Sequence, residues 1–555
     1  MKKFLFWIAV LSLLLLVACG KSADVTWDQL GQRDDLIVRE ESETTDTEIP
    51  EADVPLPAPG CDRVLESPSW RTEVYESVLQ SEEYLLQTRS YCHSNGTDLR
   101  AVRLTGTAEN APLLHFGFRE KAQISFFDEA LGQWTQGELE PGDYRALIAY
   151  LELPDGRSWL VQFPRTFRSC ENGVIELQRN KSGVLRVAGG SGHWDLTLLC
   201  GSCGEGEFCD AMLEESDEPL ITRGYSDNVL TCFARYANSI EAVWCFDGYY
   251  RFTPTTYVPS GTGRFYHCPA SYLANTIRTL PEAQAADLSI LVSMMDTLCL
   301  QQNEDGFWPT TPESTWLKTD FGIPAGFYDT RFNTDAVQLL RKVNDLFGGG
   351  LFNSAIERYA DFYQSFAGQA HLETKNGGWL VQDYWSKQVP QRTHTSLNHQ
   401  AAECLLLYHL GLQFGRDDLI DTAKKLLLGI EDTGTEWVME DHNFYYSREP
   451  DGTYNTGDYP ALTYNDLLDL QVFLQRNAGR GSEVIAVLLT EKKFWMQANN
   501  VTNYHLVEES EEFTSEPTPL PEEAASEHKT EPSADYYREE WEPRSDVTET
   551  KGDSV

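Results

Sequence analysis

Short alternating runs of apolar and polar residues fill the chain from residue 61 to residue 270. Examples are RSWLVQF, GVLRVAG and WDLTLLC, and glycine, proline, asparagine or aspartate separates most runs from the next. A period of two is typical of strands with one buried face, and regularly spaced turns favour a β-sandwich or two small β units. Residues 61–270 are therefore predicted to be a β-sandwich-like region.

The period changes near residue 280. Apolar residues now recur every three or four positions, as in SLNHQAAECLLLYHLGLQF and TYNDLLDLQVFLQRN, which is typical of helices. About seven helices are predicted between residues 284 and 496, with no pair of strands among them. Short connections such as GGG and GRDD favour antiparallel helix pairs. Residues 280–500 are therefore predicted to be an α/α-toroid, and the chain a multidomain α+β protein.

The chain begins MKKFLFWIAVLSLLLLVACG, with two lysines before an apolar run. The run is shorter than the ~20 apolar residues of a membrane span and is typical of an export signal. Its end, LVAC, resembles the lipobox of bacterial lipoproteins, which implies a signal peptide over residues 1–18 and a lipid on Cys19. The lipid would anchor the protein to a membrane of the bacterial cell envelope, outside the cytoplasm. The alternative is an ordinary secretory signal with an unrelated cysteine.

Cysteines are concentrated in the front part of the chain, where nine of the twelve lie between residues 61 and 270. Exported proteins usually carry disulfides, so this region is predicted to be disulfide-rich, with a pairing that the sequence does not give. The cluster CGSCGEGEFC would suit zinc instead, but a structural zinc site needs four ligands and only His193 lies nearby. Neither a metal nor a cofactor is predicted.

Acidic residues dominate two further segments. Residues 19–60 contain EESETTDTEIPEADVPLPAP, which is typical of an extended tether. Residues 507–555 hold 16 acidic and 4 basic residues and are predicted to be a disordered tail. The formal net charge of −42 argues against a nucleic-acid partner.

Three loops of the helical region end in tryptophan after a glycine turn. They are NEDGFW at Trp308, TKNGGW at Trp379 and EDTGTEW at Trp437. If these loops meet at one end of a ring of helix pairs, their aromatic rings would line a cleft with polar neighbours. Such a cleft suits sugar rings, so a polysaccharide or oligosaccharide is the predicted partner. The alternative is that each tryptophan only fills the end of its own helix pair.

Four short motifs follow one another between residues 370 and 475. They are NGGWLV (376–381), TSLNHQAAECLLLYHLGL (395–412), DTG (432–434) and DYPALTYNDLLDL (458–470). In order and approximate spacing they resemble the C-terminal catalytic domain of D-glucuronyl C5-epimerases, which invert uronic acid residues within heparan-type polysaccharides. The resemblance implies an isomerase that acts on a uronate-containing polysaccharide.

C5 epimerisation removes a proton next to the uronate carboxylate and returns one to the opposite face. It therefore needs two proton-transfer groups and a cation that holds the carboxylate. The resemblance implies that Tyr459 is one catalytic residue and that Tyr445 or Tyr446 is another. The candidate substrate-binding residues in or near the motifs are Arg448, Asn398, Trp379 and Trp437.

The chain departs from the family before its Leu-Asn helix. The family has a Glu-Tyr pair there, and gap-free counting places Lys387 and Gln388 at those positions. Neither residue replaces a glutamate or a tyrosine in kind. Lys387, Arg392 and His394 would instead bind an anionic group of the substrate.

The sequence leaves three functions open. The first is an epimerase or lyase-like enzyme that abstracts the C5 proton of a uronate, and the second is a non-catalytic glycan-binding or scaffold lipoprotein. The third is an α/α-toroid glycoside hydrolase, which would need two carboxylates about 5–10 Å apart. Its candidates by loop position, each also explicable as a helix cap or a loop charge, are Asp432, Glu436, Glu440 and Asp458.

The start of the last motif allows a simpler reading. Asp458 or Thr463 would cap the helix that follows. Tyr464 shares the helical spacing of Leu467 and is predicted to lie in the core. Tyr459 fits neither role, and it is therefore the preferred catalytic candidate.

Overall fold

The computed structural model describes residues 61–128, 133–190, 192–221, 242–270, 272–279, 284–514 and 520. The predicted signal peptide, Cys19 and the acidic tether lie outside the described residues. Most of the predicted acidic tail lies outside them as well, although residues 507–514 contain η6 (Val507–Glu509) and α12 (Glu511–Thr514). Among the helices that the structure describes, none is long and apolar enough to cross a membrane.

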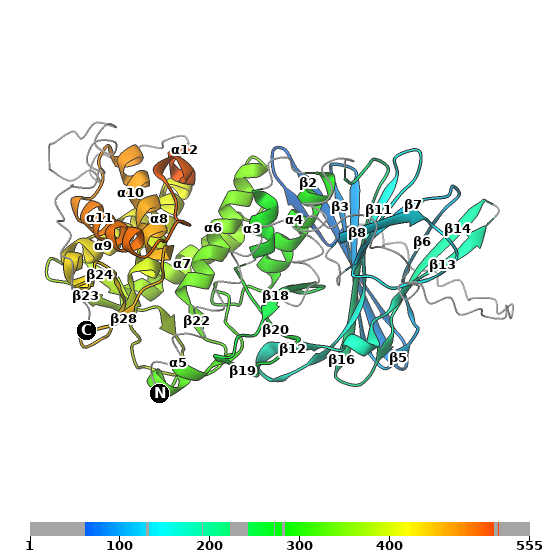
Figure 1. Ribbon diagram of the computed structural model, residues 1–555, viewed down its shortest axis with the longest axis horizontal. Helices are drawn as coiled ribbons and strands as arrows, with labels where there is room; N and C mark the ends of the chain where they lie inside the picture. Colours follow the sequence, from blue (N-terminus) through cyan, green and yellow to red (C-terminus); the bar gives the residue numbers. More distant parts are fainter. Residues whose placement is uncertain are drawn as a thin grey trace, which may run out of the picture.

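One antiparallel sheet of 13 strands forms the centre of the front half (Figure 1). Strands β10, β7 and β8 extend from β11 as a branch, and the other ten strands follow one path. In order along that path they are β1 (Arg63–Glu66), β2 (Arg71–Gln80), β3 (Tyr84–His93), β4 (Thr97–Gly106), β16 (Glu207–Ser216), β11 (Ser158–Ser169), β12 (Val174–Leu177), β20 (Arg264–His267), β18 (Gly248–Phe252) and β17 (Ala242–Cys245). The branch strands are β10 (Ile148–Glu152), β7 (Gln123–Asp128) and β8 (Gln133–Glu138).

A four-stranded sheet covers one face of the large sheet. Its strand order is β6 (Pro112–Phe118), β14 (His193–Leu199), β13 (Val184–Gly190) and β9 (Gly142–Tyr144). Alternate residues of the large sheet, such as Val102, Val161 and Leu213, pack with Leu196 and Leu198 of β14 in one apolar core. The period of two therefore reports a buried face, as expected for strands. Small elements nearby are β5 (Ala108–Glu109), β15 (Ser202–Cys203), η3 (Glu171–Gly173) and η4 (Arg179–Lys181).

The opposite face of the large sheet is covered by helix α4 (Ala285–Leu300), with α3 (Tyr272–Arg278) beside it (Figure 1). Of the 16 residues of α4, 12 are buried, because the helix lies between the sheet and the helices that follow. Asp296 of α4, which is 3% exposed, binds the guanidinium of Arg63 in β1. The hydroxyl of Tyr91 in β3 also donates to Asp296, at 2.9 Å. These contacts fix α4 to the sheet.

The remaining helices form the back half around α8 (Leu397–Phe414). Of the 18 residues of α8, 14 are buried, and the helix contacts α6, α9 and α10. A helix that is apolar on nearly all sides is expected at the centre of a helical domain. The other helices are α5 (Thr315–Phe321), α6 (Thr330–Leu346), α7 (Asn353–Gln369), α9 (Asp417–Thr433), η5 (Gly434–Trp437), α10 (Leu462–Ala478) and α11 (Glu483–Ala498).

Short strand pairs occupy the loops between these helices, so the prediction of no strand pairs in the helical region is wrong. β22 (Tyr328–Asp329) pairs with β25 (Tyr384–Trp385), and β23 (His371–Glu373) pairs with β24 (Trp379–Val381). β27 (Tyr445–Arg448) lies between β26 (Thr395–Ser396) and β28 (Tyr454–Gly457). One pair, β19 (Tyr257–Val258) with β21 (Glu313–Ser314), joins the front and back halves.

The predicted fold class is wrong. A disulfide-rich β-sandwich-like region followed by an α/α-toroid was expected, whereas the chain is built around one large branched antiparallel sheet, with helices in its C-terminal half. The ten cysteines that the structure describes are all free thiols, and Cys232 lies outside the described residues. Burial raises the pKa of the Cys203 thiol to about 12, which makes it unreactive. The prediction of a disulfide-rich region is therefore wrong for the ten described cysteines.

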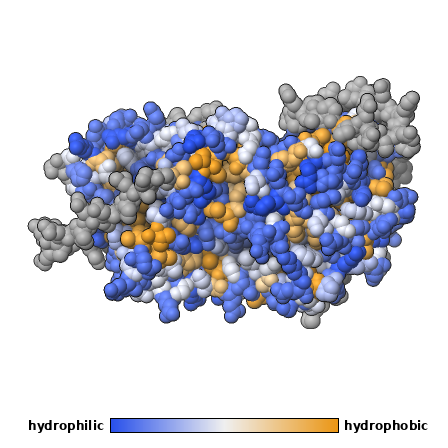
Figure 2. Space-filling view, turned by 180° about the vertical axis from the view of Figure 1, so that it is seen from behind, coloured by the Kyte–Doolittle hydropathy of each residue, from blue (hydrophilic) through white to orange (hydrophobic). Residues whose placement is uncertain are grey.

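Figure 2 shows the face opposite to that of Figure 1, and most of it is hydrophilic. Apolar side chains gather in small patches, several of them near the middle of the long axis. The individual exposed apolar residues include Val78 and Leu79 at the end of β2 and Phe494 of α11. Scattered exposed apolar residues of this kind are normal for a folded domain.

Candidate functional site

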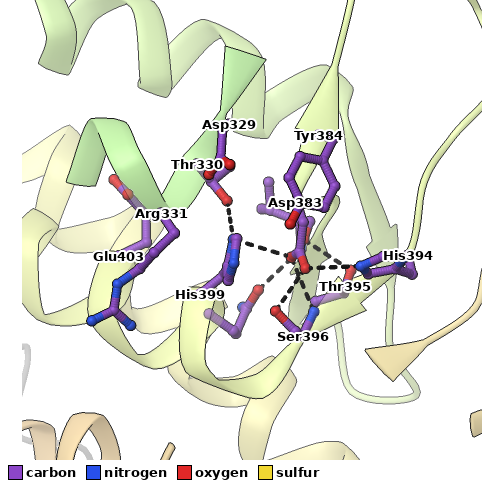
Figure 3. A network of polar contacts seen from close by, with 12 residues as sticks. Asp329, Thr330, Arg331, Asp383, Tyr384, His394, Thr395, Ser396, His399 and Glu403 are labelled. Atoms are coloured by element: carbon purple, nitrogen blue, oxygen red, sulfur yellow. Dashed lines mark hydrogen bonds and ion pairs between the residues drawn. The ribbon is translucent and has the colours of Figure 1, made fainter. Parts of the chain in front are cut away.

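Three short segments meet near the N-terminal ends of α6 and α8 (Figure 3). The pairing of β22 with β25 brings Asp329 beside Tyr384. The Thr330 N–H then donates to the Asp383 carbonyl at 3.0 Å, and the Asp383 N–H donates to the His394 carbonyl at 2.9 Å. Backbone hydrogen bonds therefore place Asp329, Asp383 and His394 in one cluster.

Asp383 is the centre of this polar network (Figure 3). Its carboxylate accepts hydrogen bonds from the Ser396 backbone N–H at 3.0 Å and from the Ser396 hydroxyl at 2.6 Å. Nε2 of His394 lies 3.3 Å from one carboxylate oxygen, and Nδ1 of His399 lies 3.7 Å from the other. Burial raises the pKa of Asp383, but the two histidines and Ser396 outweigh burial and hold it below its usual value. Asp383 is therefore a buried anion.

The two histidines respond differently to the same carboxylate. For His394, burial lowers the pKa, but the hydrogen bond and the charge of Asp383 outweigh burial and raise it. For His399, burial is the stronger effect and lowers the pKa to about 4. The Thr330 hydroxyl lies 2.5 Å from Nδ1 of His399, and in a neutral imidazole this nitrogen can accept the hydroxyl's hydrogen bond. Of the two, His394 is the imidazole that carries a proton more readily near neutral pH.

A series of tyrosines extends from His394 toward the surface. The rings of Tyr384 and Tyr446 each lie edge-on to His394 at 5.7 Å, and Tyr446 lies edge-on to Tyr459 at 5.6 Å. Tyr384 is buried, Tyr446 is half-buried, and Tyr459 is 39% exposed. Burial and the neighbouring Tyr459 raise the pKa of Tyr446, and burial and Asp458 raise the pKa of Tyr459. These phenols are protonated at neutral pH and can donate protons.

Asp329 adds a second carboxyl group to the cluster. It caps α6, because its side chain accepts a hydrogen bond from the Phe332 N–H at 3.1 Å. Burial, assisted by the charge of Asp383, raises the pKa of Asp329 to about 7. The charge of Asp329 contributes to the raised pKa values of Tyr384, Tyr446 and Tyr459, so it lies within electrostatic range of all three. A carboxyl with this pKa can act as a base or as an acid at neutral pH.

Arg331 is the permanent cation of the cluster. Its guanidinium binds Asp466 of α10 at 2.6 Å and Asp335 of α6 at 2.9 Å. The side chain remains 18% exposed, and its charge opposes the rise in the pKa of Tyr459. Burial raises the pKa of Asp466 to about 7, even though Arg331 lowers it. The cluster therefore contains two carboxyl groups that titrate near neutral pH.

Trp316 of α5 closes one side of the cluster. Its ring stacks on His394, with 5.7 Å between the ring centroids and 17° between the planes, and lies edge-on to Tyr384 at 5.3 Å. Trp316 is half-buried, so it reaches the surface as Tyr459 does. The Thr315 N–H donates to the Thr256 carbonyl at 2.8 Å, which ties α5 to the front half of the chain.

Among the predicted site residues, the structure brings Tyr446, Tyr459 and His394 together. A second group contains Tyr445, Arg448 and Trp437, each of which lies near Tyr454 of β28. Trp437 is fully buried, and its ring N–H donates to the Thr433 hydroxyl at 2.9 Å.

The other predicted residues lie apart from both groups or are covered. The ring of Trp379 stacks on His371, with 3.9 Å between the centroids, and the ammonium of Lys425 lies 4.0 Å from the Trp379 centroid. Arg392 donates to the His371 carbonyl. Asn398, in the first turn of α8, is 2% exposed, and its side-chain oxygen has no hydrogen-bond partner among the described residues.

The carboxylates proposed for a hydrolase have local partners. Asp432 accepts hydrogen bonds from Thr374 and Asn376. Glu436 accepts from the Tyr454 hydroxyl at 3.0 Å. Glu440 is exposed. Asp458 binds Lys492 at 2.8 Å rather than capping α10, which begins without a side-chain cap. Tyr464 is 3% exposed, which confirms the prediction that it lies in the core.

The sequence analysis missed Asp329, Asp383, Tyr384 and Trp316. An acid–tyrosine pair does reach the cluster, but it is Asp383–Tyr384, four positions before the pair that gap-free counting gives. Lys387 lies instead on the surface and binds Asp305 at 2.5 Å. The local signal was the DY dipeptide in VQDYW, which gap-free counting passes over.

The cluster combines a buried anion, an imidazole that can carry a proton, three phenols and two carboxyl groups with pKa values raised to about 7. This set suits proton transfer to and from a bound molecule. Within the described parts of the chain, no group of three or more histidines, cysteines and acids is arranged to hold a metal ion.

Comparison with known proteins gives only distant similarities. No family model matches the chain, and no curated protein matches it. Among solved structures, it is similar to a D-mannose isomerase (15% identity, TM-score 0.33, 42% of this chain and 62% of the other). It is similar also to the cellobiose 2-epimerase of Spirochaeta thermophila DSM 6192 (12%, 0.27, 41% and 50%). A family 76 glycoside hydrolase from a bovine Bacteroides thetaiotaomicron strain aligns over 79% of this chain and 80% of its own, at 13% identity and a TM-score of 0.33.

The three similar structures are all carbohydrate-processing enzymes by name. This chain spans less than two thirds of the length of the first two. At these TM-scores the similarity assigns neither fold nor activity.

Proposed function

We propose that the protein is a carbohydrate-active enzyme that moves the proton at C5 of a uronic acid residue in a polysaccharide. The observation that carries the proposal is the series Tyr384, Tyr446 and Tyr459 beside the Asp383–His394 pair. Epimerisation needs a proton donor and a proton acceptor that differ in pKa. The cluster offers phenols with raised pKa values and a carboxyl group, Asp329, with a pKa of about 7.

In the proposed reaction, the uronate lies over Tyr459 and Tyr446, the parts of the series that reach the surface. Asp329, in its anionic form, accepts the C5 proton either directly or through a tyrosine hydroxyl. A protonated tyrosine then returns a proton to the opposite face of C5. His394, kept protonated by Asp383, stabilises the negative charge that develops on the substrate carboxylate. Asp329 then returns the proton that it accepted to the tyrosinate, directly or through water, so both groups regain their starting protonation states and no cofactor is needed.

One observation favours a second candidate, a glycoside hydrolase. Asp329 and Asp383 are two carboxyl groups whose pKa values are shifted in opposite directions. Glycoside hydrolases use such a pair as acid and base. Both oxygens of the Asp383 carboxylate are, however, already bound by Ser396 and the histidines, which makes Asp383 a poor partner for a substrate. The epimerase proposal is therefore preferred. Attachment to the bacterial envelope through Cys19 stays a prediction.

The test is exchange of the C5 proton in D₂O with a panel of uronate oligosaccharides. We expect the wild-type protein to exchange the C5 hydrogen for deuterium. The rate of this exchange should be at least ~10²-fold lower in Tyr459→Phe. The matched control is Tyr464→Phe on the same helix, which should keep the rate because Tyr464 lies in the core. Release of new reducing ends without exchange would favour the hydrolase. Glycan binding without either reaction would leave a non-catalytic binding protein.

A further inference from the structure

Lys492 of α11 is a fully buried lysine directly behind Tyr459. Its ammonium nitrogen lies 2.7 Å from Asn443 Oδ1, 2.8 Å from Asp458 Oδ2 and 2.7 Å from the Tyr459 carbonyl oxygen. An ammonium group has three hydrogens, so each has one acceptor and none remains for another partner. The ammonium nitrogen lies over two aromatic rings, 5.2 Å from the centroid of Phe444 and 4.9 Å from that of Trp495.

The acceptors of Lys492 all belong to the backbone path that presents Tyr459. Asn443 precedes β27, and its side-chain oxygen also accepts from the Phe444 N–H at 2.8 Å. The Asp458 N–H donates to the Phe444 carbonyl at 2.9 Å, and the other carboxylate oxygen of Asp458 accepts from Thr463 of α10 at 2.8 Å. One cation therefore joins the start of β27, the end of β28 and the start of α10.

Tyr459 is 39% exposed, and its side chain contacts Tyr446 through the ring and through a hydrogen bond. The position of its hydroxyl therefore depends on Tyr446 and on its own backbone, and Lys492 binds that backbone at the carbonyl. We propose that Lys492 is a positioning residue that sets the place of Tyr459 relative to Tyr446. The consequence for catalysis rests on the proposed function, whereas the positioning itself does not.

The experiment places 3-fluorotyrosine at position 459 of the full chain and records its ¹⁹F resonance. Lys492→Gln removes the charge and one or more of the three donors. We expect the resonance to shift or to split, because the carbonyl of residue 459 loses its partner. The matched control is Ile356→Ala in α7, a fully buried residue of the same half that is none of the three acceptors of Lys492. It lowers stability by creating a cavity and should leave the resonance unchanged.

A second measurement compares C5 exchange in the same variants. A displacement of a reacting group by about 1 Å can reduce a rate by ~10²-fold. We therefore expect kcat to fall in Lys492→Gln, with KM less affected, and to stay near the wild-type value in Ile356→Ala. If wild type exchanges no uronate at all, the proposed function fails while the ¹⁹F comparison still decides the positioning.

An unchanged resonance in folded Lys492→Gln would overturn the proposal. So would an equal change in Ile356→Ala, because the effect would then follow stability alone. If Lys492→Gln does not fold, Asn443→Ala gives the same test, since it removes one acceptor and keeps the other two. A shift in this variant supports the proposal, and an unchanged spectrum contradicts it.

Discussion

Each half of the molecule buries a charged network, and the two networks differ in their cation. In the sheet, Arg103 binds Asp210 at 2.7 and 2.8 Å and Asp247 at 2.7 and 2.8 Å, with Phe208 under its guanidinium at 4.0 Å. In the helical half, Asp383 has two histidines instead. An arginine stays charged at every working pH, whereas a histidine changes its charge near neutrality.

The difference suggests a structural role for the Arg103 network and a chemical role for the Asp383 network. The Arg103 network satisfies its donors with fixed partners and lies away from the tyrosine series. The Asp383 network holds a proton that can move, beside phenols that lead to the surface. Three changes break or sharpen this contrast, and the largest effect is expected in the sheet.

Arg103→Met should lower the free energy of unfolding by about 3–5 kcal/mol, because Asp210, which is 2% exposed, would lose the guanidinium that compensates its buried charge and keep only a neutral donor such as the Phe246 N–H. Denaturation in urea measures this change. Arg186→Met is the control, since Arg186 binds the exposed Asp143 at the surface and a pair of that kind contributes at most about 1 kcal/mol. Equal losses in the two variants would mean that the buried network has no special role in the sheet.

Asp383→Asn should have a smaller effect on stability and a direct effect on chemistry. Without the carboxylate, burial, the largest influence on His394, is opposed only by the weaker effects of charges such as Glu449 and Asp320, so the His394 pKa should fall below its ordinary value and the rate of C5 exchange should drop by ~10²-fold. An NMR titration of the His394 ring reports the pKa. Asp361→Asn, at an exposed ion pair with Arg416, should change neither quantity.

The same variant should alter the pH dependence of stability in a defined direction. The pKa of Asp383 is lowered on folding, so its contribution is present above the unfolded value near 3.8 and is lost as the pH falls. The pKa of His394 is raised on folding, so its contribution is present below 6.5 and is lost as the pH rises through the folded value. In Asp383→Asn the free energy of unfolding should therefore vary less with pH than in wild type, on the acidic side and on the alkaline side. An unchanged pH dependence would contradict this account.

Glu403→Gln should give the smallest effect, and a stabilising one. Glu403 of α8 contacts Thr334 and the Tyr359 hydroxyl, its other carboxyl oxygen has no partner among the described residues, and burial raises its pKa to about 8. A raised acid pKa means that stability falls as the pH rises from about 4.5 to about 8. The gain in Glu403→Gln should therefore widen as the pH rises through this range. A gain that is constant between pH 5 and pH 8 would show that Glu403 does not titrate.

Local structure could be predicted where one face of an element is buried. The run RSWLVQF lies in β11, and SLNHQAAECLLLYHLGLQF contains α8. Periodicity reports which residues face the core, but it does not report which strands pair. Strand β4 pairs with β16, over one hundred residues away, and nothing in either run specifies that partner. The prediction of disulfides failed for a related reason, because the number of cysteines does not report which thiols lie close enough to form a bond.

The site was predicted only in part, for a physical reason. Tyr446 and Tyr459 were found through a resemblance and His394 as a cation in the segment that departs from it, and the three do come together. Asp383 and Asp329 were missed, because each looks locally like a turn or cap residue and gains its charge relations only from partners distant in sequence. Trp437 has a ring that is fully buried, which a loop motif alone does not reveal.

The position of α4 has a consequence for how the molecule comes apart. The helix belongs by sequence to the back half, yet one of its sides is the lining of the sheet. Separating the halves would remove α4 from the sheet, expose the apolar face that it covers, and leave Asp296 without its ion pair to Arg63. Neither half can melt while the other stays intact, so heating should produce a single calorimetric peak rather than two.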